Sequence, residues 1–181
     1  MPKLSANCNI DYKGMKVLYL TVPSFFDLEI SLIRELSRFC DVTVMMIVSP
    51  EGKNSSAFSI NKLLPKSQIV LGCDFLEVQK YGHLIDLNKW YIANNPDNSI
   101  NSCWKLALQI KNFIKDGKYD LLHSTTNCKT SFFLIPFVWK FKNTLYTTHD
   151  PIPHVKRNLL ARLIKSDTYY HAFKNLLFLS H

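Results

Sequence analysis

One hexapeptide of this sequence combines residue types that can move protons and bind sugar hydroxyls. His149-Asp150-Pro151-Ile152-Pro153-His154 directly follows the β-rich run Asn143–Thr148. Because the two prolines favour extended backbone and exclude a helix, we expect a rigid loop at a strand end. A histidine in such a loop can donate a hydrogen bond to a sugar or transfer a proton near neutral pH. His149 is therefore the candidate catalytic residue, and Asp150 and His154 are candidate substrate-binding residues.

Two other interpretations of this loop stay open. The histidines could be satisfied within the loop and have no role in chemistry. Alternatively, His149, Asp150 and His154 could supply metal ligands, as in a metal-dependent hydrolase. The chain has no HExxH motif and no second His-Asp pair beside the loop, so we expect no metal.

Polar side chains also follow two other predicted strands. Ser124, Thr125 and Asn127 come at the end of the run DLLHS and offer hydroxyl and amide groups to a sugar, although helix capping would explain much of the same pattern. Ser24 and Phe25 follow the first apolar run, where they are candidate substrate contacts. No GxGxxG motif is present at that turn, which argues against a dinucleotide cofactor.

The elements that must position these residues alternate between strands and helices. We predict strands at 16–22, 42–48, 69–73, 120–124, 143–148 and 175–180, and helices at 25–39, 100–115, 128–140 and 155–173. Ser24 is the expected cap of the first helix, whose apolar side chains are Phe25, Leu28, Leu32, Ile33, Leu36 and Phe39. The segment 49–98 is the least regular. The alternation predicts an α/β fold, a Rossmann-like parallel sheet with helices on both faces, in one domain of residues 15–181 after a polar extension of residues 1–14.

The charge of the chain indicates the kind of partner it binds, and its cysteines indicate the cellular compartment. The chain has a net charge of +8, and residues 101–181 hold twelve Lys and Arg against four Asp and Glu, which suits an anionic partner. No nucleic-acid-binding motif is present, so we expect no nucleic acid partner. Five scattered cysteines without a CxxC pair indicate a reduced, cytoplasmic protein.

A peripheral membrane contact is a further alternative. The longest apolar run, Phe132–Trp139, is too short to cross a bilayer. Its side chains could dip into a bilayer interface beside Lys140 and Lys142, although packing of a helix on the sheet is favoured. The apolar side chains concerned are Phe132, Phe133, Leu134, Phe137 and Trp139.

Several of these segments together resemble a known enzyme family. MKVLYLT, LIRELSR followed by DVTV, KYDLLHS and YTTHDPIPH are similar to the amino-terminal domain of the glycosyltransferase group 1 family, retaining enzymes with two Rossmann-like domains (the GT-B fold). The resemblance runs from about Lys16 to His181, and THDPIPH is its most specific part. It implies that this chain is the acceptor-side half and that His149 lies near the transferred sugar.

The same resemblance implies a reaction and a missing partner. A sugar would pass from a nucleoside diphosphate to an acceptor hydroxyl, in a glycan or on a lipid carrier, with retention and with no cofactor besides the nucleotide sugar. The family's donor-binding domain carries an E-x7-E motif, and no pair among Glu29, Glu35, Glu51 and Glu77 has that spacing. We therefore expect no transfer without a separate donor-binding domain or subunit. The alternative is a non-enzymatic Rossmann-like domain that binds a glycan or a partner.

The resemblance also has one local departure. The family's glycine-rich turn after the first strand falls on Pro23 to Phe26, where this chain has no glycine. A side chain at each of these positions keeps the backbone amides farther from a phosphate or an acceptor than glycine would.

Overall fold

The computed structural model describes residues 14–54, 58–61, 63–126, 128–148 and 175–178. The described strands are β1 (Lys16–Thr21), β2 (Asp41–Val48), β3 (Gln68–Leu71), β4 (Trp90–Asn94), β5 (Leu121–Ser124), β6 (Thr144–Thr148) and β7 (Asn175–Phe178). The described α-helices are α1 (Phe26–Leu36), α2 (Leu76–Gln79), α3 (Ile100–Gly117) and α4 (Lys129–Val138).

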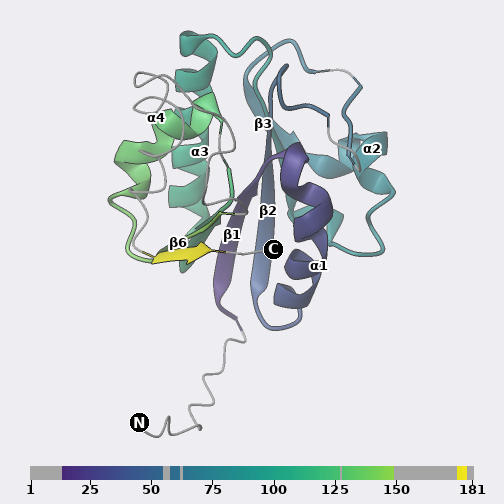
Figure 1. Ribbon diagram of the computed structural model, residues 1–181, viewed down its shortest axis with the longest axis vertical. Helices are drawn as coiled ribbons and strands as arrows, with labels where there is room; N and C mark the ends of the chain where they lie inside the picture. The colour runs from purple at the N-terminus through teal and green to yellow at the C-terminus, as the bar shows by residue number, and fades with distance from the viewer. Residues whose placement is uncertain (1–13, 55–57, 62, 127, 149–174, 179–181) are drawn as a thin grey trace, which may run out of the picture.

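These strands form one sheet with helices on both faces. The described residues give a seven-stranded sheet in the order β3-β4-β2-β1-β5-β6-β7. Each neighbouring pair is parallel except β3 with β4, which is antiparallel. Figure 1 shows α1 and α2 on one side of the sheet and α3 and α4 on the other. The predicted α/β class, with a Rossmann-like sheet covered on both faces, is confirmed.

Each face of the sheet has its own hydrophobic core, because successive strand residues point to opposite faces. In β1, Val17 and Tyr19 belong to the core under α1 and α2, and Leu18 and Leu20 belong to the core under α3 and α4. The α3/α4 core also contains Met45, Ile47, Ala93, Leu106, Ile110, Leu122, Leu134 and Tyr146. The α1/α2 core also contains Phe26, Ile33, Val44, Met46, Phe58, Val78, Trp90 and Ile92.

The first helix buries a different face from the one predicted. α1 begins at Phe26, after a short 3₁₀ helix (Pro23–Phe25), and its buried side chains are Phe26, Glu29 and Ile33. Leu28, Leu32 and Phe39 are exposed. The sheet faces the row at i, i+3 and i+7 from Phe26, and Phe39 lies beyond the end of the helix at Leu36. The predicted stripe was wrong in those three positions.

The segment 49–98 contains a central strand that the sequence analysis missed. β4 (Trp90–Asn94) pairs parallel with β2, aligning Val44 with Trp90 and Val48 with Asn94. The predicted strand at 69–73 is present as β3, but it runs antiparallel to β4 at the edge of the sheet. The Asn94 side chain holds the segment that leads into β3. Its amide donates to the carbonyl oxygens of Leu64 (3.0 Å) and Lys66 (2.8 Å).

The later elements lie close to the predicted ranges. Ser99 caps α3 by accepting a hydrogen bond from the Ser102 amide (3.2 Å). The helix runs through Gly117 and ends at Lys118, whose φ of 50° is left-handed. Pro136 lies in the last turn of α4. The predicted strands at 120–124, 143–148 and 175–180 are confirmed as β5, β6 and β7, whereas the predicted helix at 155–173 lies outside the described residues.

Candidate functional site

The strand order makes the carboxyl ends of β1 and β5 a topological switch point, where a ligand crevice is expected in an open parallel sheet. β1 leads through α1 to β2 on one side, and β5 leads through α4 to β6 on the other. In open parallel sheets, ligands bind where two neighbouring strands send their connections in opposite directions. Leu20 of β1 pairs with Ser124 of β5 in the register. The strand ends that lead into Ser24 and Phe25 on one side and into Thr125 on the other therefore lie side by side at this point, which we call the β1/β5 crevice.

The first candidate residues lie on the β1 side of the crevice. Ser24 is exposed within the 3₁₀ helix, and Phe25 is partly buried against the core under α3 and α4. The predicted capping role of Ser24 was wrong: the residue in the N-cap position of α1 is Phe25, and its side chain makes no capping hydrogen bond. An exposed hydroxyl at this strand end remains available to a ligand.

Ser124 and Thr125 on the β5 side are buried, and their hydroxyl groups bond within the protein. The Thr125 hydroxyl donates to the Leu20 carbonyl oxygen (3.3 Å), and the Thr125 amide donates to the same oxygen (3.0 Å). Ser124 Oγ lies 2.9 Å from Thr126 Oγ1. These contacts tie the ends of β1 and β5 together. In this conformation the two residues shape the crevice, and a role in substrate binding stays a prediction.

The hydroxyl contacts continue into the start of α4. The Ser131 hydroxyl donates to Thr126 Oγ1 (2.9 Å), and Ser131 Oγ lies 3.2 Å from Cys128 Sγ. Tyr146 of β6 donates its hydroxyl to the Thr126 carbonyl oxygen (3.3 Å). Burial raises the pKa of the Cys128 thiol. Because the thiolate is the nucleophilic form, this cysteine is not a candidate nucleophile at neutral pH.

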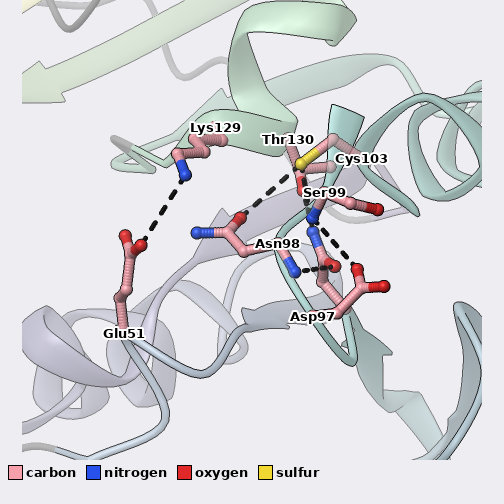
Figure 2. Close-up of polar contacts among 8 residues, drawn as sticks. Glu51, Asp97, Asn98, Ser99, Cys103, Lys129 and Thr130 are labelled. Atoms are coloured by element: carbon pink, nitrogen blue, oxygen red, sulfur yellow. Dashed lines mark hydrogen bonds and ion pairs between the residues drawn. The ribbon is translucent and has the colours of Figure 1, made fainter. Parts of the chain in front are cut away.

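The loop after β4 adds amide groups to the same edge (Figure 2). Asn95 Nδ2 donates to Thr130 Oγ1 (3.1 Å) and to Cys103 Sγ (3.2 Å), so one amide joins α4 to α3. The Asn98 amide donates to Asn95 Oδ1 (3.0 Å), and Asn98 has a left-handed φ of 57°, which asparagine tolerates. Figure 2 also shows Lys129 reaching Glu51 of the loop after β2. Their atoms Nζ and Oε1 are 3.6 Å apart, and both side chains are exposed.

A second polar cluster lies on the α1 face of the sheet, and the sequence analysis missed it. Glu29 is buried on α1, and Thr21 at the end of β1 donates its hydroxyl to the Glu29 carboxylate. Tyr19 and His123 are neighbours on β1 and β5, with ring centroids 4.4 Å apart. His123 Nε2 lies 2.8 Å from Thr147 Oγ1 of β6. The sequence feature that could have revealed this cluster is Glu29, a carboxylate that shares a helix face with the apolar residues Phe26 and Ile33.

The Tyr19 hydroxyl is a buried polar group of that cluster that lowers the stability of the fold. The side chain is fully buried, and its oxygen has no hydrogen-bond partner among the described residues. Burial raises the pKa of Tyr19 far above its usual range, and the nearby Glu29 charge raises it further. A buried hydroxyl without a partner costs free energy, because it loses its hydrogen bonds to water on folding.

Tyr19→Phe is therefore expected to raise the free energy of unfolding by about 1 kcal/mol. The matched change is Thr21→Val, which removes the hydrogen bond to the buried Glu29 carboxylate and should lower the free energy of unfolding by about 1–3 kcal/mol. Urea denaturation of both variants measures these effects. A clear loss of stability in Tyr19→Phe would show that the hydroxyl has a stabilising role that this geometry does not explain.

The remaining candidate residues lie outside the described residues. These are Asn127, His149, Asp150 and His154. The structure does describe the strand before His149, since β6 runs parallel to β5 and ends at Thr148. The His149 segment therefore follows a strand whose carboxyl end lies at the same edge of the sheet as the β1/β5 crevice. In the described part of the chain, no group of three or more His, Cys, Asp or Glu side chains is arranged to hold a metal ion.

Comparisons with known proteins give distant structural likenesses. No protein-family model matches the chain, and no curated protein sequence matches it significantly. The chain is similar to the C-terminal domain of a hydrogenase from Pyrococcus furiosus, with 10% identity and a TM-score of 0.47 over 76% of this chain and 92% of that one. It is also similar to MurG from Acinetobacter baumannii, a GT-B glycosyltransferase, with 12% identity and a TM-score of 0.47 over 93% of this chain and 42% of that one. Likenesses of this level carry no argument about activity.

Proposed function

We propose that this chain is the acceptor-side half of a retaining, sugar-nucleotide-dependent glycosyltransferase. The observation that carries the proposal is the switch point in the strand order between β1 and β5. Ser24 follows β1, Ser124 ends β5 and His149 follows β6, and the carboxyl ends of these parallel strands lie at one edge of the sheet. The sequence resemblance of KYDLLHS and YTTHDPIPH to group 1 glycosyltransferases supports the same assignment, because both segments end at this edge.

In this proposal each part of the crevice has a distinct role. The fixed hydroxyl and amide contacts around Thr126 and Asn95 hold the strand ends and the start of α4 in place. A rigid rim of this kind lowers the cost of orienting an acceptor hydroxyl for attack. His149 would contact the transferred sugar, and Asp150, His154 and Asn127 would bind acceptor or sugar hydroxyls. Positive groups of the donor-binding half would stabilise the leaving diphosphate without a divalent metal.

The basic charge of the second half of the chain supports an anionic donor or acceptor. Residues 101–181 carry the whole net charge of +8, and charge of one sign near a crevice raises the rate of encounter with an oppositely charged ligand. A cytoplasmic location, where nucleotide sugars would be the donors, belongs to the same proposal. A non-enzymatic glycan-binding role uses the same crevice, and the experiment below separates the two.

The decisive experiment restores the donor-binding half. The coding sequence downstream of codon 181, or a neighbouring gene, is read for a second Rossmann-like domain with E-x7-E and is co-expressed with this chain. We expect sugar transfer only when both parts are present, with the product anomer of the same configuration as the donor. Binding of a glycan by this chain, with no transfer by any combination, would instead assign a non-enzymatic binding role.

A further inference from the structure

The outward faces of α3 and α4 carry exposed aromatic side chains at helical spacing. On α4, Phe132, Pro136 and Trp139 recur at i, i+4 and i+7, and all three are exposed. Trp139 is 71% exposed and Phe132 is 42% exposed. On α3, Ile100 and Trp104 are one turn apart, and they are 78% and 44% exposed. Large apolar side chains that stay exposed together on two helices indicate an interaction surface.

Ring contacts join four of the aromatic side chains across the two helices, and Trp139 follows directly after α4. The Trp104 ring on α3 lies 6.1 Å from the Phe133 ring and 6.4 Å from the Phe137 ring on α4, measured between centroids. Phe132 and Phe133 are 5.7 Å apart in the same way. We call Trp104, Phe132, Phe133, Phe137 and Trp139 the aromatic surface. Leu134 and Val138 point inward and are buried, so α4 packs on the sheet with one face and presents aromatic rings on the other.

Lysines accompany the aromatic surface. Lys111 Nζ lies 5.2 Å from the centroid of Phe137, and Lys111 and Lys115 continue the Trp104 row along α3 at i+7 and i+11. The lysines on the two helices and just after them are Lys105, Lys111, Lys115, Lys118, Lys129, Lys140 and Lys142. Asp116 is the single acidic residue in the sequences of α3 and α4. The patch is therefore both aromatic and basic.

The exposed apolar side chains of α1 do not have this combination. Leu28, Leu32 and Phe39 are exposed on the opposite face of the sheet, but the charges around them are mixed. There, Glu35 forms ion pairs with Arg34 (3.1 Å) and Arg38 (2.7 Å). Charge thus distinguishes the α3/α4 face from the α1 face, although both expose apolar side chains.

We propose that the aromatic surface and its lysines bind the surface of an anionic phospholipid bilayer. Phe and Trp side chains on one helical face favour the boundary between headgroups and acyl chains, and lysines beside them pair with anionic headgroups while their methylene stems lie along the apolar layer. Among the described residues, no helix is long and apolar enough to cross a membrane. In this proposal, α3 and α4 lie with the aromatic surface against the bilayer. This inference does not depend on sugar transfer, and each can fail without the other.

Vesicle co-sedimentation of the purified chain tests the proposal. We expect binding to vesicles of phosphatidylglycerol mixed with phosphatidylcholine, and little binding to phosphatidylcholine alone. The triple variant F132S/W139S/W104S should lower the partition coefficient for the anionic vesicles by about tenfold or more, because it removes the apolar part of the contact. Lys111→Glu and Lys140→Glu should each lower it by at least about fivefold, and added salt should weaken binding by the wild-type chain.

The matched control changes exposed apolar side chains on the other face. Leu28→Ser with Phe39→Ser should leave vesicle binding unchanged, and thermal melting confirms that every variant is folded. The proposal is overturned if anionic vesicles do not bind the chain, or if the control lowers binding as much as the triple variant. Sedimentation of the chain without vesicles, abolished by the triple variant, would also overturn it by showing that the surface binds a second copy.

Tryptophan fluorescence gives a second readout that does not depend on sedimentation. Trp90 is fully buried in the α1/α2 core, so a change on adding vesicles reports on Trp104 and Trp139. Anionic vesicles should shift the emission to shorter wavelength, and the shift should disappear in Trp139→Phe/Trp104→Phe. An unchanged emission of the wild-type chain in the presence of excess anionic vesicles would contradict insertion of these rings.

Discussion

Replacing His149 with alanine is expected to lower sugar transfer by about 100- to 10,000-fold in the enzyme with its donor-binding half restored. That range is typical when a positioned proton donor or acceptor is removed from a reacting centre. The expectation comes from the place of His149 in the chain, one residue after β6 ends beside β5. The rate is measured as kcat and kcat/KM for transfer to the acceptor.

The control for this change is a histidine remote from the crevice. His83 is exposed in the segment between α2 and β4, and His83→Ala should leave both rate constants unchanged. The melting temperature of His149→Ala should match that of the original chain, since the change is meant to affect chemistry alone. Turnover of His149→Ala at the original rate would remove His149 from the mechanism and leave the crevice as a binding site.

Trp90→Ala is expected to lower the free energy of unfolding by about 3–5 kcal/mol, the largest stability effect that we predict. Trp90 begins β4 and is fully buried. Its ring centroid lies 4.9 Å from Phe26, 6.1 Å from Phe58 and 6.1 Å from Tyr81. Because α1, the loop after β2 and the segment after α2 meet β4 at this ring, its removal leaves a cavity that no single neighbour can fill.

The comparison residue carries the same side chain at the surface. Trp139→Ala should change the free energy of unfolding by about 0.5 kcal/mol or less, because the ring is 71% exposed. Trp90→Phe should cost much less than Trp90→Ala, since the indole Nε1 of Trp90 has no hydrogen-bond partner in the described part of the chain and the contribution is packing. Guanidinium denaturation of the three variants gives the values. Equal effects of Trp90→Ala and Trp139→Ala would mean that the aromatic cluster does not stabilise the core.

The two proposals bear on different faces of the molecule. The β1/β5 crevice lies at the carboxyl edge of the sheet, whereas the aromatic surface lies on the outside of α3 and α4. α4 belongs to both, because its first residues contact Thr126 and Asn95 and its outer face carries Phe132 and Trp139. A chain bound to a bilayer through α4 would hold the crevice at a fixed height above the lipid headgroups.

The sequence by itself determined the elements with a strong local pattern. β1 and β2 are continuous apolar runs, and α3 has a capping serine and a regular apolar row, so their types and positions follow from local preference and periodicity. The edge of the sheet at which candidate residues gather also followed, because parallel strands bring their carboxyl ends to one edge, whereas the strand order that makes β1 and β5 neighbours came from the structure. His149 was assigned by its position after a strand and by resemblance, and it remains a prediction.

Only the tertiary structure decided which side chains meet. The four apolar residues at the start of β4 are too few to distinguish a strand from a buried helical segment. They form a strand inside the sheet because β2 pairs with β4. The face of α1 that packs on the sheet is set by tertiary contacts, because Phe26 and Ile33 join the core that contains Tyr19 and Trp90. This orientation buries Glu29 beside Thr21 and leaves Leu28 exposed. Burial of Ser124 and Thr125, and exposure of Phe132 and Trp139, depend on long-range packing that no local pattern encodes.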